Sequence, residues 1–219
     1  MDSRSHIACY IPGVAVVGIV FNLIVLVAAP LARPDLDLFQ KALSYFAVGP
    51  WGVLQATAFT AMGIASIALA LALLWAGAPT LWMRVAVPML VIGGLGSLGL
   101  VVYPMGEPGP TTLLGDAHQT AGTIGGVAQL AAALAFVLAI RSDPRWRGAV
   151  MPAGVAFGVA LLGSILTQTA IWWPESGIPM GAVMRLAVVP LVVLWGVVAF
   201  RLRRRCLRPG FATRSAAAR

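Results

Sequence analysis

The chain has 219 residues, of which 60% are hydrophobic and 10% charged, whereas a soluble domain has roughly 45–50% apolar and about 25% charged residues. Together with a mean hydropathy of +0.92, this composition excludes a water-soluble globule and an intrinsically disordered chain. The net charge of +8 does not indicate a nucleic-acid partner, because seven of the 15 basic residues lie in the last 19 positions and the charge is not spread as a binding face would need.

Six apolar runs follow one another along the chain. A membrane-spanning helix needs about 20 mainly apolar residues, and the predicted spans are residues 10–31, 53–76, 85–103, 118–140, 149–173 and 181–200. The first run is longer than the roughly 7–15 apolar residues of a signal peptide, so we expect it to be a retained span. The predicted fold class is all-α, with six transmembrane helices in one bundle over residues 1–219 and a basic tail at 201–219.

Basic residues predict the orientation, because cytoplasmic segments of membrane proteins are rich in lysine and arginine. On the side opposite the termini lie only Arg33, Lys41 and Arg185. The side of the termini carries Arg4, Arg84, Arg141, Arg145, Arg147, Arg201, Arg203, Arg204, Arg205, Arg208, Arg214 and Arg219. We therefore expect a multi-pass protein of the cytoplasmic (inner) membrane with both termini in the cytoplasm. The basic tail is expected to bind anionic lipid headgroups, with docking to a cytoplasmic partner as the alternative.

A weak internal repeat relates the second span to the fourth. Residues 57–76 align with residues 120–139, and half of the aligned positions are identical. This pattern predicts a parallel two-helix hairpin repeat, in which Gly63 corresponds to Gly126 and Gly94 to Gly158, with spans six and one as a split third unit. A duplicated scaffold explains such a repeat without any function, although parallel repeats also occur in transporters.

Small and aromatic residues mark the surfaces of the predicted helices. The pairs Gly122-x-x-x-Gly126 and Gly154-x-x-x-Gly158 have the spacing that lets helices approach closely in lipid. Such helix faces can pack within the bundle or against other membrane subunits. Aromatic side chains near the span ends are expected to form interfacial belts; they are Trp51, Tyr103, Trp172 and Trp173 on the outer side, and Trp75, Trp82 and Trp146 on the inner side.

Several kinds of membrane chemistry lack the residues that they need. A bis-histidine haem is not expected, because His6 and His118 fall on opposite sides of the membrane. No zinc motif and no glycine-rich nucleotide loop occurs, and no span has an acidic residue near its midpoint for ion pumping. Cys9 and Cys206 are expected as lone residues in the cytoplasm, which argues against a thiol oxidoreductase. We expect no cofactor and no metal.

One polar cluster remains at the predicted outer mouth of the bundle. His118, flanked by Asp116 and close in depth to Asp35, Asp37 and Ser44 of the first loop, could act as a general acid or base near neutral pH. These considerations make His118 and Asp116 the candidate catalytic residues. If the spans surround a common mouth, a polar vestibule with the Glu107 loop as its lid is expected there; its lining residues would be Gln55, His118, Gln168 and Arg185, with Met184 beside them.

Structural explanations compete with this interpretation. Asp116 and Gln119 have the spacing of a capping box at a helix start, which would leave His118 in a wetted first turn without a chemical role. Arg185 has a similar alternative, in which it pairs with an acidic loop residue such as Glu175 and binds no substrate.

Two stretches resemble a known family. The segment from Ser44 to Gly52, and the combination of Tyr103-Pro104, a Pro/Gly-rich loop and Gly115-x-x-His118, resemble the domain of unknown function 998 family of prokaryotic membrane proteins. The resemblance implies six spans, a serine-containing motif after the first span and a Gly-x-x-His element that opens the fourth. In this chain Met105-Gly106-Glu107 follows Tyr103-Pro104, where the family pattern has aromatic-Pro-x-Asp. The family name implies no activity.

The sequence thus favours a non-enzymatic integral membrane protein, acting as an accessory or lipid-facing subunit of the cytoplasmic membrane. Its expected partners are membrane lipids and other membrane subunits. The alternative is an outward-facing membrane enzyme, or a protein that binds a small molecule or lipid, with a vestibule around His118. A transporter is the third hypothesis, and the lack of ionisable groups at mid-depth argues against it.

Overall fold

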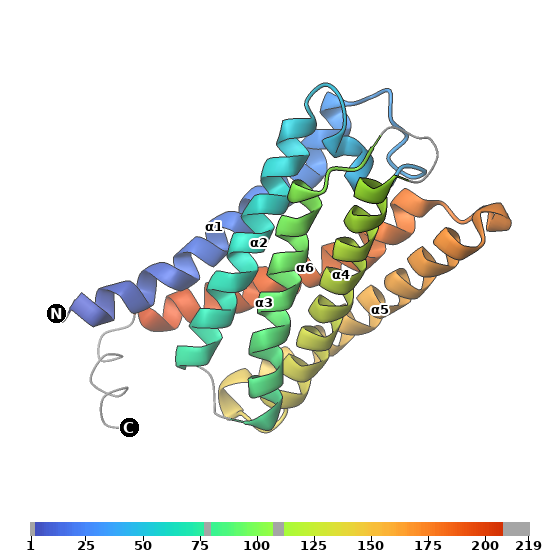
Figure 1. Cartoon of the computed structure of the whole chain (residues 1–219). Helices are drawn as coiled ribbons and strands as arrows, with labels where there is room; N and C mark the ends of the chain where they lie inside the picture. Colours follow the sequence, from blue (N-terminus) through green and yellow to red (C-terminus); the bar gives the residue numbers. More distant parts are fainter. Residues whose placement is uncertain (1–2, 77–79, 107–111, 208–219) are drawn as a thin grey trace.

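The computed structural model describes residues 3–76, 80–106 and 112–207, and this part of the chain is built from helices and their connections. The long helices are α1 (Ser3–Ala32), α2 (Gly52–Ala76), α3 (Leu81–Val102), α4 (Leu113–Ile140), α5 (Val150–Trp172) and α6 (Met180–Cys206). Three short 3₁₀ helices lie between them: η1 (Leu43–Ala47), η2 (Pro144–Ala149) and η3 (Pro174–Ser176). All six long helices are long and apolar enough to cross a membrane. The predicted all-α bundle of six spans is therefore confirmed (Figure 1).

Threonine caps fix the starts of two helices earlier than hydropathy predicts. The Thr80 side chain accepts a hydrogen bond from the Met83 N–H at 3.1 Å, so α3 begins at Leu81. In the same way the Thr112 hydroxyl accepts from the Gly115 N–H at 3.1 Å, and α4 begins at Leu113. The predicted capping box of Asp116 and Gln119 is therefore wrong, because the helix already has its N-cap one turn earlier.

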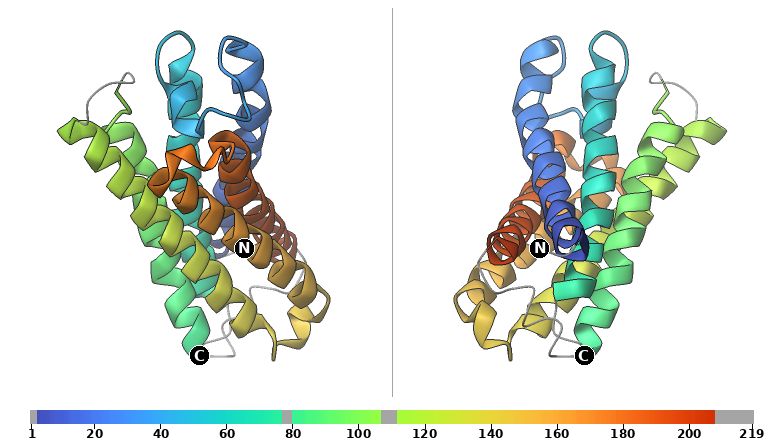
Figure 2. Two further views of the ribbon diagram at one scale, coloured as in Figure 1. Left: turned by 90° about the vertical axis from the view of Figure 1, so that its right-hand side faces the viewer. Right: turned by 90° about the vertical axis from the view of Figure 1, so that its left-hand side faces the viewer.

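Neighbouring helices pack mainly in chain order. Helices α3 and α4 run side by side over most of their lengths. Helix α2 packs between α1 and α3, and α6 pairs with α5 (Figures 1 and 2). Helix α6 also contacts α1, α2 and α4, and it keeps one exposed apolar face that includes Val193 and Phe200. Its fully buried Trp195 meets Phe136 of α4 edge to face, with ring centroids 5.7 Å apart. Aromatic pairs of this geometry are favourable beyond the area that they bury.

Glycines let the backbones of adjacent helices touch. A Cβ on Gly94 of α3 would lie 2.7 Å from the carbonyl oxygen of Gly63 of α2, and a Cβ on Gly96 would lie 2.5 Å from the Cα of Gly125 of α4. By contrast, the predicted repeat equivalents Gly126 and Gly158 have open space around them. The two proposed hairpin units are therefore packed differently, and their superposition stays a prediction.

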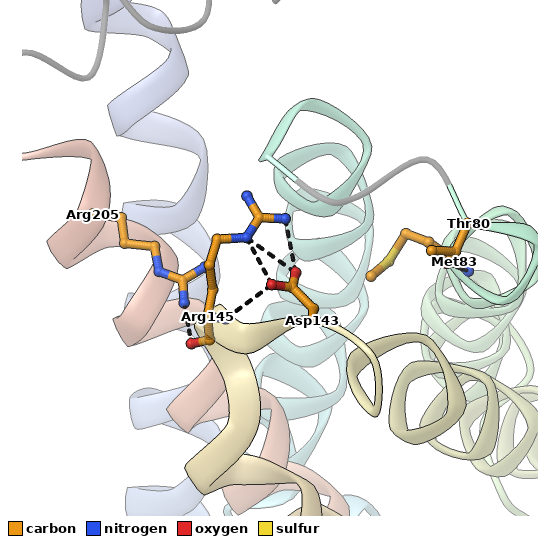
Figure 3. Close-up of polar contacts among 5 residues, drawn as sticks. All are labelled: Thr80, Met83, Asp143, Arg145 and Arg205. Atoms are coloured by element: carbon orange, nitrogen blue, oxygen red, sulfur yellow. Dashed lines mark hydrogen bonds and ion pairs between the residues drawn. The ribbon is translucent and has the colours of Figure 1, made fainter.

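Polar contacts close the end of the bundle that holds the start of α1 and the end of α6. Asp143 and Arg145 form an ion pair at 2.8 Å, and the Arg205 guanidinium donates to the Arg145 carbonyl at 2.8 Å (Figure 3). The hydrogen bond from Arg145 lowers the pKa of Asp143 below its usual value. The Arg201 and Arg205 guanidinium groups lie over the Trp146 ring. The first arginines of the basic segment thus hold the η2 turn.

Two sequence expectations at this end are wrong. Trp146 is not a member of an interfacial belt, since its side chain is 3% exposed and packs against Phe136 with ring centroids 5.3 Å apart. Cys206 is disulfide-bonded, so it is not a lone residue. A paired Cys206 gives no reason to exclude thiol chemistry.

Candidate functional site

The short helix η1 is anchored at the opposite end of the bundle. Its Phe46 side chain is 1% exposed and packs among Val25, Ala29 and Ala58 of α1 and α2. On the other flank, the Leu43 N–H contacts the Met184 sulfur of α6 at 3.4 Å. Hydrophobic burial therefore holds this connection in place between three helices.

A tight turn joins η1 to α2. Gly49 has a φ of +73°, a left-handed conformation that favours glycine, and Trp51 shares that region with a φ of 66°. A Cβ on Gly52 would collide with the Ala47 carbonyl, so only glycine permits this return of the chain. The left-handed backbone at Trp51 is strained, and such strain persists only where the surroundings enforce it. These residues belong to the first motif of the family resemblance, and they fix the direction of η1.

His118 of α4 is buried, with 6% of its surface exposed, and both of its ring nitrogens have partners. Nδ1 lies 2.6 Å from the Tyr103 carbonyl oxygen, and Nε2 lies 2.8 Å from the Ser44 hydroxyl oxygen. A carbonyl oxygen can only accept, so Nδ1 carries the hydrogen and donates it to Tyr103. In the neutral imidazole Nε2 then accepts the hydrogen bond from the Ser44 hydroxyl. The structure thus brings together three segments that are distant in sequence.

The Tyr103 carbonyl is available because α3 ends there. Tyr103 is the C-cap of α3, and the carbonyl groups of a last helical turn lack helical donors. Pro104 follows and has no N–H, so it ends the helix. His118 satisfies the carbonyl that this Tyr-Pro sequence leaves free. All three elements of the family resemblance, around Ser44, Tyr103 and His118, therefore meet in one hydrogen-bonded chain.

This arrangement has the chemistry of a nucleophile with its base. A serine hydroxyl becomes nucleophilic when a neighbouring imidazole takes its proton, and a third group must hold that imidazole in the correct tautomer. Ser44, His118 and the Tyr103 carbonyl occupy these three positions. The same bonds also tie η1 to α3 and α4, which is a structural role.

Of the carboxylates expected near His118, two have other partners and the third is exposed. Asp35 forms an ion pair with Arg33 at 2.8 Å, and the hydrogen bond from Arg33 lowers the pKa of Asp35 below its usual value. Asp37 accepts from the Phe39 backbone N–H at 2.7 Å. Asp116 is exposed on α4. In the described ranges none of these acids hydrogen-bonds His118, and no group of three or more potential metal ligands occurs there.

The predicted vestibule residues lie at the same end of the bundle. Gln55 is fully buried in the first turn of α2, and Gln168 is half-buried near the end of α5. Among the described residues, no hydrogen bond joins His118 to Gln55, Gln168 or Arg185. The His118 ring is directed into the protein and not toward lipid. A common mouth lined by these side chains stays a prediction, and its proposed lid at Glu107 lies outside the described residues.

Arg185 has a different partner from the one expected. Its Nη1 donates to the carbonyl oxygens of Leu38 and Gly181, and its guanidinium lies 5.4 Å from the centroid of the Phe46 ring. The expected pairing with Glu175 is wrong, because these two described residues form no ion pair. Arg185 instead holds the first loop and the Phe46 ring of η1 against α6.

The sequence places Ser44 near His118 only in depth and does not predict their contact. The signal that could have found it is the family resemblance, since Ser44 and His118 each stand in one of its motifs. Hydropathy could not, because it gives no information on the rotation of each helix about its axis.

Comparison with known proteins identifies one family. The family model described as "Protein of unknown function (DUF998)" matches residues 16–201. This range begins within the first apolar span, ends within the last, and includes all of the residues of the Ser44–His118 site. No curated protein matches the chain, and no solved structure does.

Proposed function

Since the chain belongs to the DUF998 family of proteins of unknown function, we propose that it is a membrane enzyme in which Ser44 and His118 transfer or hydrolyse an acyl group. The observation that carries this proposal is the 2.8 Å contact between Ser44 Oγ and His118 Nε2, with Nδ1 held by the Tyr103 carbonyl. A histidine without this second bond could present either nitrogen to the serine. Because Nδ1 carries the hydrogen, the nitrogen that faces Ser44 is the basic Nε2.

The proposed reaction proceeds in two steps. Ser44 Oγ attacks the carbonyl carbon of an ester while its proton passes to His118 Nε2, and the alcohol leaves with that proton. Water, or a second alcohol, then attacks the acyl-serine; His118 takes its proton and returns it to Ser44. The positive charge that forms on the ring is shared with the Tyr103 carbonyl through Nδ1–H. No cofactor is required for this cycle.

The proposed substrate is an amphiphilic ester carried by the bilayer. Ser44 is half-buried close to one end of the spans, where Trp51, Trp172 and Trp173 are largely exposed. Exposed tryptophan is typical of the membrane–water interface. Ester bonds of membrane lipids lie at the same depth, just beneath their headgroups, so a lipid could reach Ser44 without leaving the membrane.

Labelling with a lipid-tailed fluorophosphonate tests this proposal without knowledge of the substrate. The purified protein is expected to form a covalent adduct on Ser44, detected by mass spectrometry of its peptides. Ser44→Ala should abolish the adduct, and His118→Gln should slow labelling by about 100-fold or more, because general-base catalysis typically contributes 10²–10⁴-fold.

Ser97→Ala is the matched control, since the Ser97 hydroxyl donates only to the Gly93 carbonyl of its own helix, at 3.2 Å. It should label at Ser44 like the unchanged protein. If Ser44 stays unmodified while His118→Gln lowers the thermal midpoint of unfolding, the bonds at His118 are structural and the enzyme proposal fails.

A second candidate function is the non-enzymatic accessory subunit that the sequence favoured. The specific observation in its favour is α5, where Gly154 and Gly158 have open space around their Cβ positions. Such a face accepts a helix of another membrane protein at close range. Gentle purification tests it: this candidate requires a partner protein that stays bound and that Gly154→Leu releases.

We also propose that the termini lie in the cytoplasm and that Ser44 faces the outer side of the cytoplasmic membrane. The arginine distribution along the whole chain supports this orientation. The disulfide at Cys206 favours the opposite one, because disulfides persist in oxidising compartments. We base the proposed orientation on the arginines, because basic residues set the orientation of the spans while these insert into the membrane.

Cysteine labelling decides between these orientations. In a cysteine-free background, single cysteines at Thr111 and Ser215 should react with a membrane-impermeant maleimide from opposite sides, Thr111 from outside. Labelling of both from one side would exclude three spans between these positions, and with them the six-span arrangement. Labelling of Ser215 from outside would reverse the orientation and place Ser44 on the cytoplasmic side.

A further inference from the structure

A groove of about 660 Å³ opens between α1, α2 and the end of α6. It lies at the end of the bundle opposite Ser44 and has no part in the proposed reaction. Its lining is apolar except for one charged side chain; it includes Tyr10, Gly13, Val17, Gly18, Ile64 and Arg203. Pockets that enclose small ligands have volumes of roughly 300–1,000 Å³, so the groove has room for a ligand of that size.

Two glycines give the groove its depth. At Gly18 the helices α1 and α2 cross so closely that a Cβ would lie 2.7 Å from the Ala61 carbonyl oxygen. At Gly13 a Cβ would meet only the Arg203 Nε, at 3.9 Å. From Tyr10 to Gly18 the helix rises about 12 Å at 1.5 Å per residue. The groove therefore extends from the start of the span toward the apolar middle of the bundle.

Arg203 gives the groove a positive charge at the end near the start of α1 and the end of α6. Its side chain is exposed and forms no ion pair in the described residues, where the Asp143 carboxylate at this end is bound by Arg145. A guanidinium presents its N–H groups as a planar fork that fits the oxygens of a phosphate. An apolar channel with a cation at headgroup depth matches a phospholipid in both shape and charge.

We propose that this groove is a binding site for one anionic phospholipid, with an acyl chain along Val17 and Ile64 and its phosphate at Arg203. The exposed apolar side chains Tyr10, Val17 and Ile64 then contact the chain of a specific lipid. The site selects the headgroup by charge, because a zwitterionic lipid offers Arg203 no net negative charge.

Native mass spectrometry of the purified full chain tests this site with phosphatidylglycerol and phosphatidylcholine as probes. Phosphatidylglycerol should bind in preference. Arg203→Gln should weaken its binding by about fivefold, as expected for one basic residue at a membrane surface. The binding of phosphatidylcholine should weaken less, because choline already neutralises the phosphate of that lipid. Gly13→Leu should weaken the binding of both lipids by about tenfold, because a leucine side chain takes the space of the acyl chain. Val17→Trp fills the groove from another position and should do the same.

Two variants serve as matched controls. Gly154→Leu adds the same volume on α5, where the Cβ position is open, and Arg204→Gln removes a neighbouring charge whose guanidinium lies over Phe200, 5.2 Å from the ring centroid. Both should retain the lipid. Equal losses in Arg204→Gln and Arg203→Gln, or unchanged binding in the folded Gly13→Leu and Val17→Trp variants, would overturn the proposal. A lipid-free species with the mass of two chains would also overturn it, since the occupant would then be a second copy.

Discussion

Gly96→Ala is expected to destabilise the protein by about 3 kcal/mol, the upper part of the range for overpacking a well-packed contact. The new methyl group would lie 2.5 Å from the Gly125 Cα and 2.9 Å from the Ala121 carbonyl oxygen. Both are backbone atoms of α4, so no side chain can move aside and the two helices must separate. In lipid, separation loses the dispersion contacts that hold α3 to α4.

Gly125 and Gly126 supply a graded comparison for that result. A Cβ on Gly125 would lie 3.1 Å from the Gly96 Cα, a milder overlap, whereas Gly126 has open space. Alanine is favoured over glycine by about 1 kcal/mol inside a helix, so Gly126→Ala should be neutral or slightly stabilising. The free energy of unfolding, measured by denaturation in detergent micelles, should fall in the order Gly126→Ala, Gly125→Ala, Gly96→Ala. Equal effects at all three positions would mean that α3 and α4 do not touch at Gly96.

This contact also illustrates what the sequence could predict about packing. The spacing of Gly122 and Gly126 predicted the close-packed position wrongly, because Gly126 has open space around it and the glycine that meets α3 is Gly125. A spacing of four gives two residues on one face of a helix. It does not specify which face meets a neighbour, because that depends on how both helices are rotated in the assembled bundle.

The fold was more predictable than the site for a physical reason. Each span is a local property, since an apolar run of about 20 residues must cross the bilayer whatever its neighbours are. The contact between Ser44 and His118 joins residues 74 positions apart, and it depends on the anchor at Phe46, the turn at Gly49 and the end of α3. Composition carries none of this geometry. Only the motifs shared with the family contained a signal for it.

A second large effect is expected at Gln129, which joins three helices in the interior. Its Nε2 donates to the Ser66 hydroxyl of α2 at 2.9 Å, and its Oε1 accepts from the Trp195 indole N–H of α6 at 2.8 Å. Gly93 of α3 makes room for this amide, because a Cβ there would lie 2.6 Å from Nε2. The network therefore depends on all four of these helices.

Gln129→Met keeps the shape of the side chain but leaves the Trp195 N–H and the Ser66 hydroxyl without this partner. We expect a loss of about 2 kcal/mol in the free energy of unfolding, since an unsatisfied buried polar group costs about 1–3 kcal/mol. Gln119→Met is the matched control, because Gln119 is exposed on the same helix and should change stability by a few tenths of a kcal/mol at most, as surface substitutions do.

A double-mutant cycle with Trp195→Phe separates hydrogen bonding from packing, because phenylalanine has no N–H to leave unsatisfied. In the Trp195→Phe background Gln129→Met should cost about 1 kcal/mol less than in the unchanged protein, the scale of coupling found for residues in direct contact. Additive losses would mean that the indole and the amide do not interact. The cost at Gln129 would then come from its hydrogen bond to Ser66 and its packing against Gly93, and the polar link between α4 and α6 would not contribute to stability.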